Sequence, residues 1–168
     1  MAYKSRSKMN EIVDIIQDMI KSNQDILKLI NCDDNNVDIY ELPNLSRTEA
    51  SNVVRNKILT RYKEFADNQQ CCYMILQYGN KRYHHQKSMY FNGNTFDIAI
   101  FCHNDIKINN IVGDRTIEIE QVIEDIFDDK YLDKVACKCQ VVNSEPAFAR
   151  SSDYTGRHIT IAFSDFKE

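Results

Sequence analysis

Cysteine and histidine are the residues of this chain whose types and spacing could hold a metal ion. The sequence contains six cysteines and four histidines. Several of them lie close together in sequence: Cys102-His103, His84-His85 and Cys137-x-Cys139, with Cys71-Cys72 and His158 elsewhere. A structural zinc site usually has two-ligand knuckles in which a few residues separate two cysteines, and the sequence has none of them. Adjacent residues of a strand also point to opposite faces, so each adjacent pair supplies one ligand at best. We therefore expect buried thiols and surface imidazoles, with no metal and no cofactor.

Catalysis has few candidate residues. A nucleophile elbow of the G-x-S-x-G type and a glycine-rich phosphate loop are both missing from the sequence, in which the four glycines are far apart. The cysteines lie in apolar, strand-like runs, where a thiol packs as a small hydrophobe. One loose grouping suits a metal-dependent nuclease: Asp97, with Glu118 or Glu120, and Lys138. We expect no enzyme, and the nuclease is the alternative from a different functional class.

A basic segment is the first candidate contact surface. It contains Lys81, Arg82, Tyr83, His84, His85 and Lys87. Lysine and arginine with an interleaved tyrosine can bind nucleic acid by phosphate contact and stacking. A long hairpin arm that contacts a neighbouring subunit, or is simply solvated, has the same composition. Arg150 and Arg157, further along the chain, are added as expected oligomer or partner contacts.

The acidic side of a helix that follows Asp114 is the second candidate surface. Its residues are Glu118, Glu124, Asp125 and Asp128. The aspartates crowd the helix C-terminus, where the macrodipole disfavours each negative charge by about 0.3–1 kcal/mol. Three interpretations stay open: a solvated face, a surface for the basic groups of a partner, and an acidic channel wall that repels a polyanion.

Length and composition indicate one domain that spans residues 1–168. The chain is 43% hydrophobic and 27% charged, and its net charge of −4 disfavours a protein that coats the phosphate backbone. It has no apolar run of about 18 residues and no secretory signal at its start. We expect a soluble protein made in a reducing compartment, with no membrane contact.

Hydrophobic periodicity predicts an α+β fold. Residues 1–66 read as helical, with a break near Ser22 and a capping box at Ser46-Arg47-Thr48-Glu49. Residues 67–168 read as a sheet with one inserted helix, which begins at an Asp114 N-cap. The expected strands cover 71–78, 89–91, 95–103, 135–142 and 158–164, with a hairpin turn at Asn92-Gly93 and a loop through Pro146. We predict a mostly antiparallel sheet of about four to five strands, with the N-terminal helices packed on it.

The order of these elements resembles that of the tail-terminator and head–tail joining proteins of long-tailed bacteriophages. The likeness covers most of the chain, from about Met9 to Phe166, and rests on pattern and order. The segments that carry it are Ile26-Leu27-Lys28-Leu29, Val37-Asp38-Ile39-Tyr40-Glu41, the alternating strand from Phe96 to His103, Arg115 with the helix at 117–127, and the strand from Tyr154 to Ile161.

The resemblance implies a structural role without catalysis. Tail-terminator and head–tail joining proteins form a homo-oligomeric ring, commonly a hexamer, that stops polymerisation of the tail tube and joins it to the capsid connector. The implied partners are further copies of the chain, the tail-tube protein and the neck or connector proteins, and DNA only passes through the lumen. The resemblance implies that the acidic side with Glu118, Glu124, Asp125 and Asp128 faces this lumen. The implied location is the tail–neck region of the virion, with the host cytoplasm during assembly. A head-closure or minor capsid component is the alternative within this class.

Overall fold

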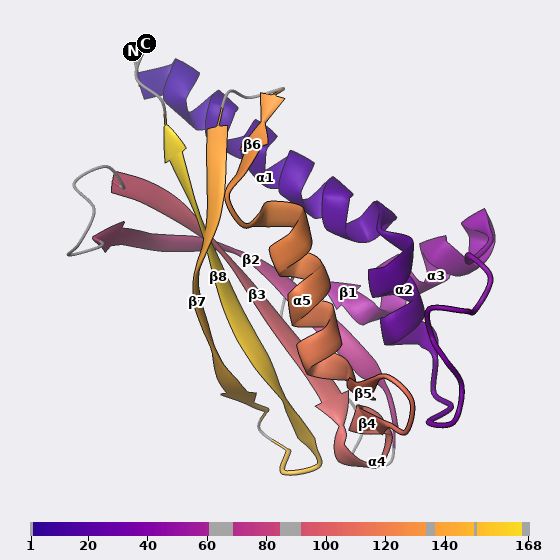
Figure 1. The fold of residues 1–168 in the computed structure, drawn as a ribbon. Helices are drawn as coiled ribbons and strands as arrows, with labels where there is room; N and C mark the ends of the chain where they lie inside the picture. The colour runs from indigo at the N-terminus through magenta and orange to yellow at the C-terminus, as the bar shows by residue number, and fades with distance from the viewer. Residues whose placement is uncertain (1, 61–68, 85–91, 134–136, 150, 166–168) are drawn as a thin grey trace.

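The structure is a computed structural model that describes residues 2–60, 69–84, 92–133, 137–149 and 151–165. Figure 1 shows a long, strongly twisted sheet with helices packed along one side of it. The helices are α1 (Ala2–Ser22), α2 (Gln24–Asn31), α3 (Arg47–Lys57), α4 (Asn104–Lys107) and α5 (Arg115–Phe127). The strands are β1 (Ile58–Leu59), β2 (Cys72–His84), β3 (Asn92–His103), β4 (Ile108–Asn109), β5 (Gly113–Asp114), β6 (Lys130–Leu132), β7 (Cys137–Phe148) and β8 (Tyr154–Asp165).

The main sheet has six strands in the order β1-β2-β3-β8-β7-β6, and β4 and β5 form a separate two-stranded sheet. Every neighbouring pair of the main sheet is antiparallel except β1 and β2, which are parallel. The α+β class and the mostly antiparallel sheet are therefore confirmed. The predicted strand count is too low, because the edge strands β1 and β6 are two and three residues long, too short for a periodic signal.

One core joins the helices to one face of the sheet, which we call the helix face. Alternate residues of β2 and β3, such as Met74, Ile98 and Ile100, pack there against Ile16 of α1 and Ile123 of α5. On the second face, Tyr73, Phe101 and Tyr154 form a smaller buried cluster. The alternation predicted for β3 is thus confirmed, since its even-numbered residues face the helices. None of the helices among the described residues is long and apolar enough to cross a membrane.

Local signals set the starts of the helices. Ser46 and Glu49 form the predicted capping box of α3, and Asp114 caps α5 by accepting a hydrogen bond from the backbone N–H of Thr116 at 2.9 Å. The break between α1 and α2 is also confirmed, and the side chain that caps α2 is that of Asn23, which accepts from the N–H of Ile26 at 3.0 Å.

Two turn predictions are wrong. Asn92 and Gly93 lie inside β3, where they pair with His84 and Tyr83, so the expected hairpin turn is not at this dipeptide. The predicted strand at 89–91 lies outside the described residues. Pro146 lies inside β7 and not in a loop; among the described residues β7 pairs only with β8 at this point, so Pro146 is on an edge strand, where a residue without an N–H is tolerated.

Buried polar side chains of α2 and β4 hold the segment between α2 and α3 in place. Asn109 donates from Nδ2 to the carbonyl oxygens of Asp34 and Val37, at 3.2 and 3.0 Å. Lys28, only 5% exposed, donates from Nζ to the carbonyl oxygens of Tyr40 and Leu42 at 3.1 and 3.3 Å. These bonds satisfy backbone groups that no helix or strand pairs, and they place Tyr40 beside α5.

Candidate functional site

The acidic side of α5 is the predicted surface that the structure defines best. Glu118 accepts a hydrogen bond from the Tyr40 hydroxyl at 2.8 Å, and Asp128 accepts one from the N–H of Val141 at 3.2 Å. Glu124 and Asp125 have no hydrogen bond or ion pair within the described residues, and Asp125 is exposed. The four acids therefore include two that stabilise the fold and two that are available to a partner.

Mutual repulsion marks this acidic side. Partial burial raises the pKa of the Glu124 carboxyl, and the negative charges of Glu120, Asp128 and Asp125 raise it further. The last turn of α5 contains no basic residue, so the negative end of the helix dipole adds to the same field. A cation placed here would relieve this repulsion.

Arg157, predicted as a partner contact, is held inside the molecule. Its Nε lies 2.6 Å from Oε2 of Glu120, and Nη2 donates to Oε1 of Glu120 at 3.0 Å and to the Ser144 hydroxyl at 2.8 Å. Ser144 in turn donates to Glu120. This network joins β8, β7 and α5 on the helix face. Sequence analysis missed Glu120 and Ser144 as its members, because nothing local links them to Arg157.

The basic segment lies at the far end of the β2–β3 pair. Lys81, Arg82, Tyr83 and His84 are the last residues of β2, and Figure 1 shows this end projecting away from the helices. β8 pairs with β3 from Asn94 onward. At Asn92 and Gly93, β3 pairs with β2, so among the described residues this end of the sheet has two strands. The predicted contacts His85, Lys87 and Arg150 lie outside the described residues.

The loose nuclease grouping is not assembled. Asp97 is on the second face of the sheet, where its Oδ1 accepts from the Thr160 hydroxyl at 2.9 Å. Glu118 and Glu120 belong to α5, which packs on the opposite, helix face. Lys138 makes an ion pair with Asp129. A two-metal or lysine-assisted site needs these groups to converge on one point, and here the sheet separates them.

A histidine between two carboxylates lies on the second face. His158 has Nε2 at 3.7 Å from Asp97 and Nδ1 at 3.6 Å from Glu145. These side chains come from β8, β3 and β7, which are neighbours in the sheet. Both ring nitrogens therefore face carboxylates, and among the described residues neither is directed at a nucleophile.

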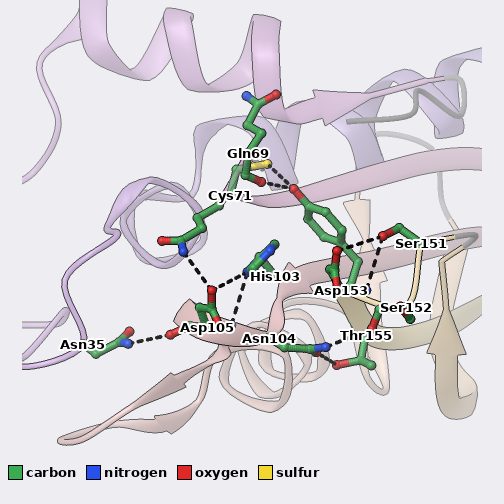
Figure 2. Close-up of polar contacts among 12 residues, drawn as sticks. Asn35, Gln69, Cys71, His103, Asn104, Asp105, Ser151, Ser152, Asp153 and Thr155 are labelled. Carbon is green, nitrogen blue, oxygen red and sulfur yellow. Dashed lines mark hydrogen bonds and ion pairs between the residues drawn. The ribbon is translucent and has the colours of Figure 1, made fainter. Parts of the chain in front are cut away.

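Polar side chains also cluster where β3 ends (Figure 2). His103 accepts from the N–H of Asp105 at 3.2 Å through Nδ1 and so caps α4, while Gln70 donates to the Asp105 carboxylate at 2.8 Å. Tyr154 donates to the carbonyl oxygen of Gln69, and its hydroxyl lies 3.4 Å from the Cys71 sulfur. Burial raises the pKa of the Cys71 thiol, which makes it a poor nucleophile. This cluster ties together three chain segments and has no activated group.

The other thiols are also packed in the interior. All six cysteines are free, and all except Cys32 are buried. The pKa of Cys72 is raised by its hydrogen bond with Cys102, which lies opposite it in the sheet, and by burial. The described residues contain no group of three or more His, Cys, Asp or Glu side chains that could hold a metal ion.

Arg115, a residue that carries part of the resemblance, is fully buried at the start of α5. Its Nη2 donates to the carbonyl oxygen of Asp34 at 3.0 Å and to Oδ1 of Asn35 at 3.1 Å. Its Nε and Nη1 have no hydrogen-bond partner among the described residues. The guanidinium therefore acts inside the fold, where it fixes the turn that follows α2.

Together these features define an α+β protein with one helix-covered sheet and a helix side on which acidic residues are crowded. Comparison with protein families makes the assignment more specific. A family model matches residues 23–163, from the cap of α2 into β8, and the chain belongs to the YomW family, which is named after a gene of a Bacillus phage or prophage. No curated protein and no solved structure matches the chain significantly.

Proposed function

We propose that this protein is a structural component of a tailed bacteriophage particle. It forms a homo-oligomeric ring, a hexamer, at the junction of tail and neck, where it terminates the tail tube and joins the tail to the head. The observation that carries the proposal is membership over residues 23–163 of a family named after a phage or prophage gene. The resemblance in element order to tail-terminator proteins supplies the specific role.

The distribution of polar groups supports a role in assembly. Several side chains whose functional groups could take part in a reaction are instead engaged within the chain. Arg157 pairs with Glu120, His103 caps the start of α4, and Tyr154 donates to the Gln69 backbone. By contrast, Glu124 and Asp125 have no partner among the described residues. A protein that acts through contacts with other chains keeps charged side chains on its surface available to those chains.

The shape of the sheet also supports it. The end of the β2–β3 pair projects from the body (Figure 1) and carries Lys81 and Arg82 in a segment suited to reach a neighbouring chain. β1 pairs with β2 only at Met74 and Ile75. The rest of this edge of β2 has no partner strand among the described residues, so it is suited to strand pairing with another subunit.

Deletion of the gene from the phage or prophage that carries it tests the proposed role. The expected result is tails of irregular, excessive length that are not joined to filled heads, with normal particles restored by a plasmid copy. Heads that join tails but lose their DNA would instead indicate head closure. Particles of normal length and infectivity would overturn the proposal. Light scattering and electron microscopy of the purified protein, alone and with tail tubes, test for the ring.

A further inference from the structure

A groove with a basic rim lies between the end of α1, the start of α2 and α3. It has a volume of about 570 Å³. Its floor includes Leu27, Leu45 and Val54, of which Leu45 and Val54 are only partly buried. When a partner covers apolar surface that is partly exposed in a groove, the free energy of the system falls.

The rim of this groove has uncompensated positive charge. Its charged residues are Lys21, Arg47 and Arg55, and no acid of the described part of the chain lines it. Lys21 donates to Oε1 of Gln17 at 3.0 Å, while Arg47 and Arg55 have no partner among the described residues.

Two acids close in sequence to these residues are engaged elsewhere, and Asp18, three residues before Lys21 on α1, is exposed and does not line the groove. Asp25 lies 3.3 Å from Nζ of Lys28, and Glu49 accepts from the N–H of Ser46 at 2.9 Å. The groove therefore suits an acidic segment that also has an apolar side chain.

A stripe of α5 that shares Asp125 and Asp128 with its acidic side has this composition. Ile117, Gln121, Asp125 and Asp128 follow one another at spacings of four, four and three residues, so they form one stripe along the helix. Ile117 is 42% exposed although it is a large hydrophobic residue. Glu124 flanks the stripe, and its raised pKa reflects the crowding of like charges. The stripe is about 16 Å long from Ile117 to Asp128 at 1.5 Å per residue.

The α5 of a molecule cannot occupy the groove of the same molecule. α2 packs against α5 on one side and against α3 on the other, so it separates the stripe from the groove (Figure 1). Complementary surfaces at two different places on one chain produce a head-to-tail contact, which closes into a ring or continues as a filament.

We propose that the acidic stripe of α5 in one copy docks into the basic groove of the next copy. Ile117 contacts the apolar floor, while the Asp125 carboxylate and the second oxygen of Asp128, whose Oδ1 accepts from Val141, face Arg47 and Arg55. This inference rests on the proposed function and names the contact between neighbouring subunits of the ring. It also assigns the acidic side of α5 to the subunit interface, where the resemblance placed it in the lumen.

Paired charge reversal tests the contact. The groove variant contains Arg47→Glu and Arg55→Glu, and the stripe variant contains Gln121→Lys and Asp125→Lys, all at exposed positions. Each variant alone presents like charges at both surfaces, so we expect its self-association to weaken by at least about tenfold, as measured by light scattering over a concentration series. An equimolar mixture of the two variants presents opposite charges at every contact, so it recovers assembly of the wild-type mass.

A control on the same helix separates a local effect from net charge. Asn52→Glu with Asn56→Glu adds negative charge to α3 at exposed positions that do not line the groove, and this variant assembles like the wild type. Circular dichroism and thermal unfolding confirm that every variant is folded.

The outcomes separate this inference from the proposed function. A wild-type ring that persists in both reversed variants overturns the docking contact and leaves the ring in place. A groove variant that still forms rings but no longer attaches to tails shows that the occupant is another protein, and this also overturns the inference. A wild-type protein that stays monomeric at every concentration, even with tail tubes, removes both.

Discussion

Arg157 of β8 and Glu120 of α5 form a two-point ion pair, with Nε 2.6 Å from Oε2 and Nη2 donating to Oε1 at 3.0 Å. The Glu120 side chain is 9% exposed and that of Arg157 is 26% exposed, so the pair is only partly screened by water. It is a specific polar link between α5 and the strands beneath it. It adds to the core packing of Ile119, Ile123 and Phe127, which also holds α5 on the sheet.

Glu120→Ala leaves the guanidinium of Arg157 without its carboxylate. We expect the free energy of unfolding to fall by about 1.5–3 kcal/mol, the range for hydrogen bonds to charged groups. Urea unfolding followed by circular dichroism measures the change. Asp125→Asn removes an acid of the same helix that has no partner among the described residues, and it should shift the free energy by less than about 0.5 kcal/mol. Equal midpoints for the wild type and Glu120→Ala would show that the pair does not stabilise α5.

Gly156→Ala tests the close approach of β8 to β3. A Cβ at this position would lie 1.7 Å from the carbonyl oxygen of Ile100 and 3.0 Å from the Cα of Phe101. These are backbone atoms in the middle of the sheet, so the strands must move apart. We expect a loss of at least about 1–3 kcal/mol, the usual cost of overpacking, measured by urea unfolding. Thr155→Ala, the neighbouring change in the same strand, should cost less, because its hydroxyl bonds only the exposed Asn104. Equal losses would contradict the close approach.

Strong local signals account for what could be predicted of the fold. The capping residues Ser46 and Asp114, and the alternation from Phe96 to Cys102, each depend on side chains close together in sequence. The sequence-based predictions failed where contacts between segments far apart in the sequence determine the local structure. Pro146 is tolerated in β7 because among the described residues β7 pairs only with β8 there, and a two-residue strand such as β1 forms only because β2 lies beside it.

The site was less predictable than the fold for the same reason. Glu120 and Arg157 are 37 positions apart, and the His158 cluster needs the register of three strands. Arg115 was noted as a helix-start residue, yet its complete burial follows from the turn at Asp34 and Asn35, which no local pattern indicates. The helix that carries the acidic side was predicted from its helical period, whereas the groove is formed by three helices, which no local pattern indicates.

Thiol labelling tests the interior position of the cysteines. Alkylating reagents attack the thiolate. Burial raises the pKa of the Cys71 thiol, and the hydrogen bond with Cys137, followed by burial, raises that of Cys139. Cys32 is only partly buried. In the folded protein we expect Cys32 to react with iodoacetamide at least about 100-fold faster than the other five, whose labelling requires opening of the fold. Mass spectrometry of tryptic peptides measures the rates.

Cys32→Ser is the control for this experiment. It should leave the folded protein almost unlabelled, while labelling in urea reaches the five remaining thiols. Fast modification of Cys71 or Cys139 in the folded wild type would show that the second face or the helix face is open to solvent at these strands.

The pH dependence of stability tests the repulsion on α5. The pKa of Glu124 is raised in the folded protein, so the folded state binds its proton more tightly than the unfolded state does. Stability from this group is thus fully present below the unfolded pKa of a glutamate, about 4.3, and is lost as the pH rises through the folded pKa. Glu124→Gln removes the charge that is penalised. We expect it to raise the free energy of unfolding at pH 7, by less than about 1 kcal/mol because solvent screens the site, and to have no such advantage at pH 4. Urea unfolding of dilute protein at both pH values measures the difference. Asp14→Asn, at an exposed position of α1, changes the net charge equally and should not reproduce the effect; if it does, the repulsion belongs to the whole molecule and not to the acidic side of α5.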